Sequence, residues 1–197
     1  MEPLNRQFYC RNTVDVAKDL LGMLLVRDSN GKVLVGKIVE TEAYGAHNDP
    51  ASHAYKKKTD RNAIMLGEQG HVYIYFTYGN HFCLNATARN SLPAGAVLIR
   101  AIEPIEGIEQ MFINRKTSVF TNIGSGPGKL TQAMKITREH NSADLCRTSE
   151  IYIARSNDKT NYKIKKSPRI GIVRGVDKAW RFLISENLHV SRKLKRK

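Results

Sequence analysis

The chain has 197 residues, 41% of them hydrophobic, with 32 Lys and Arg against 18 Asp and Glu and a formal net charge of +14. This length fits one domain with an interior large enough for a polar site. No apolar run approaches the roughly 18 residues of a membrane span, and the first residues resemble neither a signal nor a transit peptide. We therefore expect a soluble intracellular protein without a membrane partner. The positive charge favours a polyanionic partner, with nucleic acid ahead of membrane surfaces and acidic proteins.

Three cysteines, Cys10, Cys83 and Cys146, lie far apart in the sequence. An odd number without a CxxC pair argues against a disulfide framework and a zinc knuckle, and there are too few for an iron–sulfur cluster. We expect buried free thiols, no metal and no other cofactor.

The first predicted elements are a helix and a hairpin. The helix extends from Thr13, as its capping residue, to Leu21, and the glycine that follows ends it. Met23–Arg27 and Val33–Tyr44 are typical of two strands around a polar turn. The stretch 45–70 is polar with little periodicity, and loops of this length in a compact domain are usually functional or disordered.

The rest of the chain alternates strands and helices. Hairpins dominate and helices pack around them, which predicts a mixed α+β fold. The chain has no repeat and no linker, so we expect one domain over residues 1–191 and a basic tail over 192–197. The predicted elements are strands at Val72–Tyr78 and Phe82–Thr87 around the turn 79–81, a strand at Ala96–Ile102 ended by Pro104, a helix through Phe112, a helix from near Gly128, and short strands at Ile151–Ala154, Arg169–Val173 and Arg181–Ser185.

Two carboxylates and an arginine are the first candidates for chemistry. Side chains alternate along a strand, so Glu40, Glu42 and Tyr44 share one face. Such a row is usually solvent-exposed, but Arg100 lies within the apolar run 97–102. A guanidinium there needs a buried anionic partner or a polar cavity. A structural ion pair and a catalytic one are both open at this point.

The segment 72–82, VYIYFTYGNHF, is rich in aromatic residues. Alternation places Tyr73, Tyr75 and Thr77 on one face of the strand. Aromatic strands belong more often to the core than to a binding surface. Tyrosines near a hairpin tip of a basic protein also suit stacking on bases or insertion between base pairs.

Two stretches match ligand-binding patterns only in part. His47, Asp49 and His53 could bind a metal together with a glutamate, but their spacing matches no ligand signature. The stretch 123–130, IGSGPGKL, lacks the first glycine and the hydroxyl residue of a phosphate loop. A glycine-rich helix start with Lys129 still suits one backbone phosphate, and a plain capping turn explains it equally well.

The order of these motifs resembles the alkyladenine (3-methyladenine) DNA glycosylase family over nearly the whole chain. Several ordered motifs across one domain are far more specific than any single one. The matching segments are VETEAY (39–44), Asp49 with Ser52-His53, Thr59-x-Arg61-Asn62, YIYFTYG (73–79), FCLN (82–85), LIRAIEP (98–104), SGPGKL (125–130) and PRIGI (168–172).

The resemblance implies roles for the candidate residues. Glu42 would be the general base that activates water, and Arg100 would stabilise its carboxylate and help hold the water. The flipped base would stack on Tyr44 on one side and on Tyr75 and His53 on the other.

Two further residues would act on the base and on the duplex. Asn85 would exclude the 2-amino group of guanine at the pocket floor. Tyr78 would fill the gap that the extruded nucleotide leaves. Asn80 and His81 are more polar than is usual in the family, so insertion would depend more on Tyr78 alone.

The resemblance also implies a fold and a reaction. The fold is a single compact domain with a curved, mainly antiparallel sheet and a protruding β-hairpin that inserts into double-stranded DNA. The reaction is hydrolysis of the N-glycosidic bond of alkylated or deaminated purines (3-methyladenine, 7-methylguanine, hypoxanthine, etheno-adenine) after base flipping. One carboxylate suffices for it, and no lysine is placed to form a Schiff base, so we expect a monofunctional enzyme. We expect a monomer, nucleoid-associated in a bacterial cytoplasm or nuclear in a eukaryote.

Two alternatives stay open at this stage. The first is a non-catalytic RNA- or DNA-binding domain that uses the aromatic hairpin and the basic surface. The second is a metal-dependent nuclease that uses Glu40, Glu42, Asp49 and His53. The residues do not rank the lesions, and none is an evident general acid for neutral ones.

Overall fold

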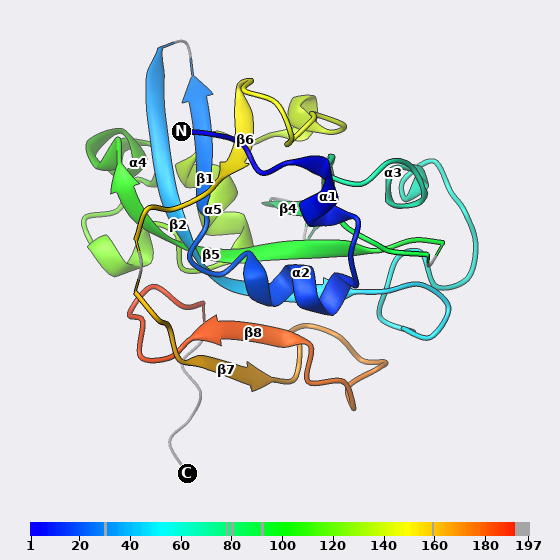
Figure 1. The fold of residues 1–197 in the computed structure, drawn as a ribbon. Coiled ribbons are helices and arrows are strands. Elements are labelled where there is room, and N and C mark those ends of the chain that lie inside the picture. Colours follow the sequence, from blue (N-terminus) through cyan, green and yellow to red (C-terminus); the bar gives the residue numbers. More distant parts are fainter. Residues whose placement is uncertain (30, 78, 80, 92, 159, 192–197) are drawn as a thin grey trace.

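The computed structural model describes residues 1–29, 31–77, 79, 81–91, 93–158 and 160–191 (Figure 1). Within these residues, eight strands form one antiparallel sheet in the order β3-β4-β5-β2-β1-β6, and β8 pairs with both β2 and β7. The strands are β1 (Leu24–Ser29), β2 (Lys32–Tyr44), β3 (Val72–Thr77), β4 (His81–Thr87), β5 (Ala96–Glu106), β6 (Ile151–Ala154), β7 (Ile164–Ser167) and β8 (Arg181–Ile184).

The helices of the described residues are short and lie around the sheet. α2 packs on β2 and β5, and α5 packs on β4 and β5 beside α4 (Figure 1). They are α1 (Arg6–Tyr9), α2 (Thr13–Asp19), α3 (Ala63–Leu66), α4 (Ile108–Arg115) and α5 (Pro127–Ala133), with 3-10 turns η1 (Phe120–Asn122) and η2 (Arg138–His140). None of them is long and apolar enough to cross a bilayer.

The long strand β2 organises the sheet. Its first half pairs with β1, whereas residues 40–42 pair with β8 on that side and with β5 on the other. The β2–β5 register shifts at Val35/Gly36 and on both sides of Glu40, and such bulges bend a strand. The sheet therefore curls, and the glutamates at positions 40 and 42 lie in its interior, where neither is exposed.

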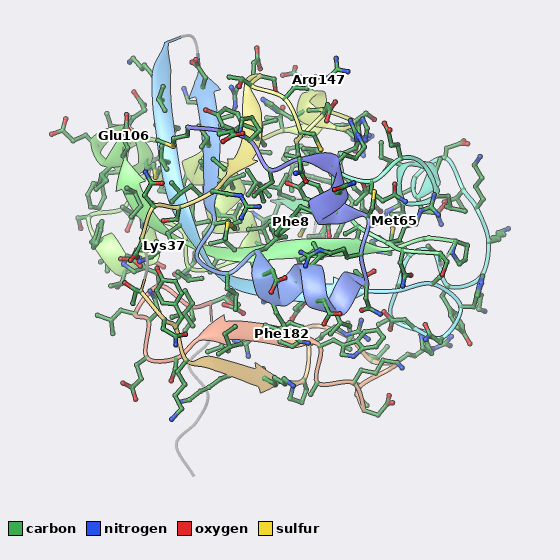
Figure 2. All side chains as sticks on the ribbon, viewed as in Figure 1. Phe8, Lys37, Met65, Glu106, Arg147 and Phe182 are labelled. Atoms are coloured by element: carbon green, nitrogen blue, oxygen red, sulfur yellow. The ribbon has the colours of Figure 1, made fainter. Side chains whose placement is uncertain are left out.

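A main hydrophobic core lies between the helices and the sheet, and two smaller clusters of buried residues lie apart from it. Val16 and Ala17 of α2 and Leu130 of α5 are completely buried in it. Phe182 of β8 also belongs to this core, whereas charged side chains such as Arg147 lie on the outside (Figure 2). The fold class is confirmed: this is a single compact α+β domain built on a curled antiparallel sheet.

The N-terminal helix forms where the periodicity predicts it, but with another cap. The side chain of Asn12, not Thr13, accepts a hydrogen bond from the amide of Val14 at 2.9 Å. The Thr13 hydroxyl donates instead to the carbonyl of Ala88 and ties the helix to the sheet. Gly22 follows the helix with φ of +85°, a left-handed conformation that favours glycine.

Two strand predictions are wrong, one at its end and the other over its whole length. Pro104 does not end β5, because it lies opposite Gly36 at a register shift, where a missing amide is tolerated. Arg169–Val173 is not a strand: its residues form bends, and the strand nearby is β7, which pairs with β8. The reason is that the amide of Ile170 donates to a side-chain carboxylate instead of to a neighbouring strand.

Two expectations concern residues that the structure does not describe, and a third concerns the cysteines. The β3–β4 hairpin forms as predicted, but Tyr78 and Asn80 in its turn, and the tail 192–197, lie outside the described residues. The expected DNA-inserting tip therefore stays a prediction. All three cysteines are free, yet only Cys83 is buried, while Cys146 is half-buried and Cys10 is exposed.

Candidate active site

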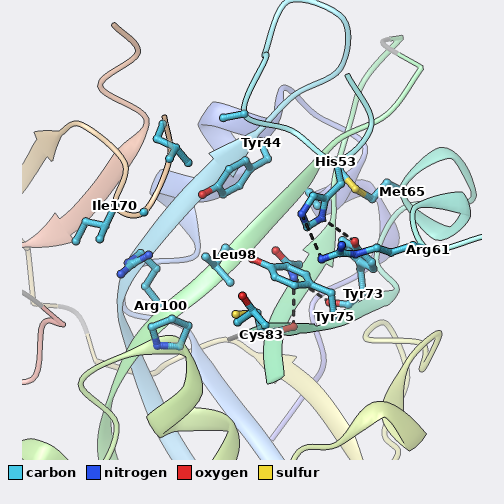
Figure 3. Close-up of a pocket in the computed structure, with 17 residues that line it drawn as sticks. Tyr44, His53, Arg61, Met65, Tyr73, Tyr75, Cys83, Leu98, Arg100 and Ile170 are labelled. Atoms are coloured by element: carbon cyan, nitrogen blue, oxygen red, sulfur yellow. Dashed lines mark hydrogen bonds between the residues drawn. The ribbon is translucent and has the colours of Figure 1, made fainter. Parts of the chain in front are cut away.

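A cavity of about 300 Å³ opens between the central strands and two loops (Figure 3). Its wall combines aromatic, polar and cationic side chains, and Tyr44 lies across it from the group that contains His53 and Tyr75. The cavity is lined by Tyr44 of β2; Ala51, His53, Arg61 and Met65 of the long loop and α3; Tyr73, Tyr75 and Thr77 of β3; Cys83 and Asn85 of β4; Ala96, Leu98 and Arg100 of β5; Pro127; and Ile170, Gly171 and Ile172.

Arg100 has the buried anionic partners that its apolar strand requires, and it also faces the cavity. Its Nε donates to Oε1 of Glu40 at 2.9 Å, and its Nη1 lies 3.2 Å from Oε2 of Glu42. Glu40 is surrounded by further donors: Nε of Arg181 at 2.6 Å and the hydroxyl of Ser191 at 2.8 Å. Glu40 is thus fully engaged in a network that, apart from Arg100, lies away from the cavity.

The partners of Glu42, in contrast, all line the cavity. Its Oε1 accepts from the amide of Ile170 at 2.8 Å, and its Oε2 accepts from the hydroxyl of Tyr44 at 2.8 Å. The carboxylate itself is not exposed and lies directly behind these residues. Catalytic hydrogen bonds often reach their working geometry only in the substrate complex, so this position is compatible with a general base.

Burial raises the pKa of Glu42 above its usual value, because the ionised form loses solvation in the interior. Arg100 pulls this pKa down, as do the Ile170 amide and the Tyr44 hydroxyl, but burial outweighs them. From the sequence we expected the charge of Arg100 to have the larger effect on this pKa. The raised pKa lies closer to neutral pH than that of an ordinary carboxyl, which suits a base that takes and returns a proton.

The opposite wall is a cluster of aromatic rings and one guanidinium. The ring of His53 meets that of Tyr75 edge to face at 4.7 Å between centroids, and its Nδ1 is hydrogen-bonded to the Tyr73 hydroxyl at 2.8 Å. The guanidinium carbon of Arg61 lies 5.2 Å from the centre of the Tyr75 ring. Burial, followed by the charge of Arg61, lowers the pKa of His53 to about 4, so this ring is neutral at physiological pH.

Asn85 lies on the cavity wall where β4 pairs with both β3 and β5. Its amide nitrogen donates to the carbonyl of Tyr73 at 3.0 Å and, more weakly, to that of Cys83 at 3.4 Å. Asn85 therefore has a structural role, because its amide cross-links β3 and β4. The same side chain also lines the cavity, so a role in base selection is compatible with it.

Lys129 lies in the first turn of α5, as the glycine-rich stretch predicts. Its amine donates to the side chain of Asn122 and lies 3.4 Å from the hydroxyl of Ser125. These contacts hold the turn together, and the phosphate contact stays a prediction.

Sequence reasoning missed the pairing of Asp49. This residue was weighed as a metal ligand, but its carboxylate accepts two hydrogen bonds from Arg169, both at 2.6 Å. Within the described residues, no group of three His, Cys, Asp or Glu side chains could hold a metal ion. The positions of Arg61 and Tyr73 in the cavity wall were also missed. Two signals were available: Tyr73 shares a strand face with Tyr75, and Arg61 and Tyr73 each belong to a motif that matches the family.

The chain is similar to known proteins over most of its length. The family model described as methylpurine-DNA glycosylase matches residues 7–188. A protein of Carboxydothermus hydrogenoformans is 47% identical over 190 residues, which cover 96% of this chain and 99% of the relative. Proteins of Francisella tularensis (46%, covering 92% and 94%) and Clostridium novyi (45%, covering 98% and 100%) are similarly close. All three are named as proposed 3-methyladenine DNA glycosylases.

The family model and these relatives define the class of this protein as a DNA glycosylase, an enzyme of DNA repair. The chain belongs to the methylpurine-DNA glycosylase family, since the family model covers most of its length and the relatives align over more than nine tenths of both chains.

Proposed function

We propose that this protein is a monofunctional DNA glycosylase that removes alkylated and deaminated purines, among them 3-methyladenine, 7-methylguanine, hypoxanthine and etheno-adenine. The observation that carries the proposal is the aromatic cavity with the Glu42–Arg100 pair behind its wall, in a member of this family. A base within a duplex cannot be attacked in the stack, so the nucleotide has to be flipped into such a pocket.

The wall suits a flipped purine. Tyr44 on one side, with Tyr75 and His53 on the other, would enclose the base between aromatic rings. Alkylation at N3 or N7 makes a purine cationic, and electron-rich rings attract cations. Asn85 would meet the 2-amino group of guanine and so exclude the undamaged base.

The chemistry needs one carboxylate. A water oxygen forms a bond to C1′ of the deoxyribose while the bond from C1′ to the purine nitrogen breaks and its electron pair leaves with the base. Glu42 accepts the proton of the attacking water and stabilises the positive charge that develops on the sugar. Arg100 holds the carboxylate and the water. The products are the free base and an abasic site.

The surrounding surface suits DNA. The net charge of +14 attracts the phosphate backbone, and Lys129 would contact one phosphate. Tyr78 would insert into the duplex at the vacated position. We propose that the protein acts as a monomer and, in a bacterium such as those of the relatives named above, in association with the nucleoid.

Incubation with a duplex that contains one hypoxanthine, in the presence of EDTA, tests the proposal. A glycosylase releases hypoxanthine and leaves an intact strand with an alkali-sensitive abasic site. Borohydride should trap no covalent complex, because no lysine lines the cavity among the described residues. Binding without base release would favour the non-catalytic nucleic-acid-binding domain, and activity that EDTA abolishes would favour a nuclease.

A further inference from the structure

A buried ion pair lies beside the cavity and belongs to neither of the glutamate networks. Nη1 and Nη2 of Arg169 each donate to one oxygen of Asp49 at 2.6 Å, and neither side chain has any exposed surface. The two residues are 120 positions apart in the sequence. The pair therefore joins the loop that follows β2 to the loop that precedes β8.

Asp49 also shapes its own loop. Its Oδ2 accepts a hydrogen bond from the amide of Gly45 at 2.9 Å, directly after β2 ends. The chain thus turns back immediately behind Tyr44. Arg169 donates to the carbonyl of Ala43 at 2.8 Å and so holds the end of the same strand.

Arg169 is linked to two parts of the proposed active site, the Tyr44 ring and the Glu42 carboxylate. Its guanidinium carbon lies 4.7 Å from the centre of the Tyr44 ring, on which the base is proposed to stack. The next residue along the chain is Ile170, whose amide donates to Glu42. A shift of Arg169 would therefore move both the stacking ring and a donor to the general base.

The packing leaves little freedom for such a shift. Nη2 of Arg169 also donates to the carbonyl of Gly175 at 3.2 Å, so the pair closes the loop 169–175 on itself. Gly175 has φ of +60°, and a Cβ atom there would come within 3.1 Å of the Arg169 guanidinium. Since a buried ion pair is weak evidence for net stability, its presence here calls for a further explanation.

We propose that Asp49 and Arg169 are positioning residues for the glycosylase reaction, which together hold the Ile170 amide on Glu42 and the Tyr44 ring at the cavity wall. This inference rests on the proposed function, because it assigns the pair to the same site. Neither residue is among those that line the cavity, so we assign them no direct contact with the base. A misplacement of about 1 Å far from the chemistry can lower a rate about 10²-fold, which sets the size of the expected effect.

The test compares Asp49→Asn, Arg169→Lys and the double variant Asp49→Asn/Arg169→Gln with the parent. The double variant removes both buried charges, so it avoids the uncompensated guanidinium that could unfold Asp49→Asn. Asp144→Asn is the matched control, because it breaks the 2.8 Å pair of Asp144 with Arg6 away from the cavity. Each protein is measured by single-turnover hypoxanthine release against pH, by binding to the same duplex and by thermal melting.

Two readouts separate positioning from a purely structural role. When the Ile170 amide leaves Glu42, a donor that lowers the pKa of this carboxylate is lost, so the acidic limb of the rate profile should move to higher pH. Trp180 is the only tryptophan of the chain and lies 5.3 Å from the Arg169 guanidinium. Its fluorescence therefore reports on the conformation of this loop even in a variant that has no activity.

We expect the folded variants of Asp49 and Arg169 to release hypoxanthine about 10²-fold more slowly than the parent. The acidic limb of their rate profile should lie at higher pH and their Trp180 emission should differ, while Asp144→Asn should match the parent in all three measurements. An unchanged rate and pH profile in the folded double variant would overturn the inference, and so would a lower rate with an unmoved limb in all three variants. A parent that releases neither hypoxanthine nor 7-methylguanine would overturn the proposed function itself, and this inference with it.

Discussion

Nη1 of Arg100 lies 3.2 Å from Oε2 of Glu42, in the interior of the curled sheet. The same guanidinium donates through Nε to Glu40, so a single arginine serves both carboxylates of the β2 face. The two glutamates differ in their other partners. Those of Glu42 line the cavity, whereas Arg181 and Ser191, which bind Glu40, do not. The geometry thus separates two residues that strand alternation alone places in equivalent positions.

Replacement of Glu42 by Gln should nearly abolish base release while binding to a damaged duplex survives. Removal of a general base typically lowers a rate by about 10²–10⁴-fold. The amide oxygen of Gln can still accept from Ile170, so the fold should persist. Single-turnover release and duplex affinity are the measurements. Glu40→Gln is the matched comparison, since it should mainly destabilise the protein through the lost ion pairs with Arg100 and Arg181. If Glu40→Gln were inactive but fully folded and Glu42→Gln were active, Glu40 would be the general base instead of Glu42.

The rate should depend on pH through Glu42. The ionised carboxylate is the active form, and burial raises its pKa above 4.5. The value of kcat/KM should therefore increase as the pH rises through this elevated pKa. His53, with a pKa of about 4, should add no limb near the usual histidine range. The dependence of kcat/KM on pH should be measured for the parent, Glu42→Asp and His53→Asn. The acidic limb should move in Glu42→Asp and stay in His53→Asn. A limb that disappears in His53→Asn would contradict its assignment to Glu42.

Thermal stability should also depend on pH through the raised pKa of Glu42. Because the pKa of Glu42 is higher in the folded than in the unfolded state, its contribution to stability is complete below the unfolded value, near 4.5, and is lost as the pH rises through the folded value. Glu42→Gln cannot ionise. Its melting temperature relative to the parent should therefore rise from acidic to neutral pH. A difference that stays constant, or that falls with rising pH, would argue against a raised pKa.

Arg61 should influence which lesions are removed. Its positive charge lines the cavity beside Tyr75 and disfavours a cationic base there. Arg61→Gln should raise the ratio of 7-methylguanine to hypoxanthine release about fivefold, which corresponds to roughly 1 kcal/mol of charge repulsion. Lys58→Gln removes the same charge from an exposed position of this loop and should leave the ratio unchanged. Equal ratios in all three proteins would show that Arg61 does not affect lesion choice.

Asn85→Ser should allow release of undamaged guanine, most visibly from mismatches, with hypoxanthine release largely retained. The shorter side chain would leave room for the 2-amino group. It would also lose the hydrogen bond to the Tyr73 carbonyl, a net stabilisation of about 1 kcal/mol. Guanine and hypoxanthine release should be measured together with the melting temperature. A less stable protein without guanine release would leave Asn85 a purely structural role.

The sequence predicts those parts of the site that local rules govern. The burial of Arg100 against carboxylates follows from a charge within an apolar strand, and the common face of Tyr73 and Tyr75 follows from strand alternation. Both are confirmed by the cavity lining and the ion pairs. The β-hairpins and the N-terminal helix follow from periodicity in the same way.

Non-local pairings could not be predicted in this way. Nothing near Asp49 indicates that its partner is Arg169, and the apolar alternation of the segment 169–173 suggests a strand. The buried ion pair and the Ile170–Glu42 bond bind this segment so tightly that a bend replaces the strand. The relative weight of burial and of Arg100 on the pKa of Glu42 likewise depends on three-dimensional packing.

The amide of Ser191 donates to Oε2 of Glu40 at 2.5 Å, across 151 positions of the sequence. The carboxylate network behind the cavity is therefore completed only by the last described residues of the chain. A ribosome that has made β2 and β5 has produced Glu40, Glu42 and Arg100, but not the segments that carry their remaining donors. Because such distant contacts form late, a nascent chain should acquire a working site only after Ser191 has been synthesised. Translation itself thus delays the appearance of an activity that breaks glycosidic bonds in the genome.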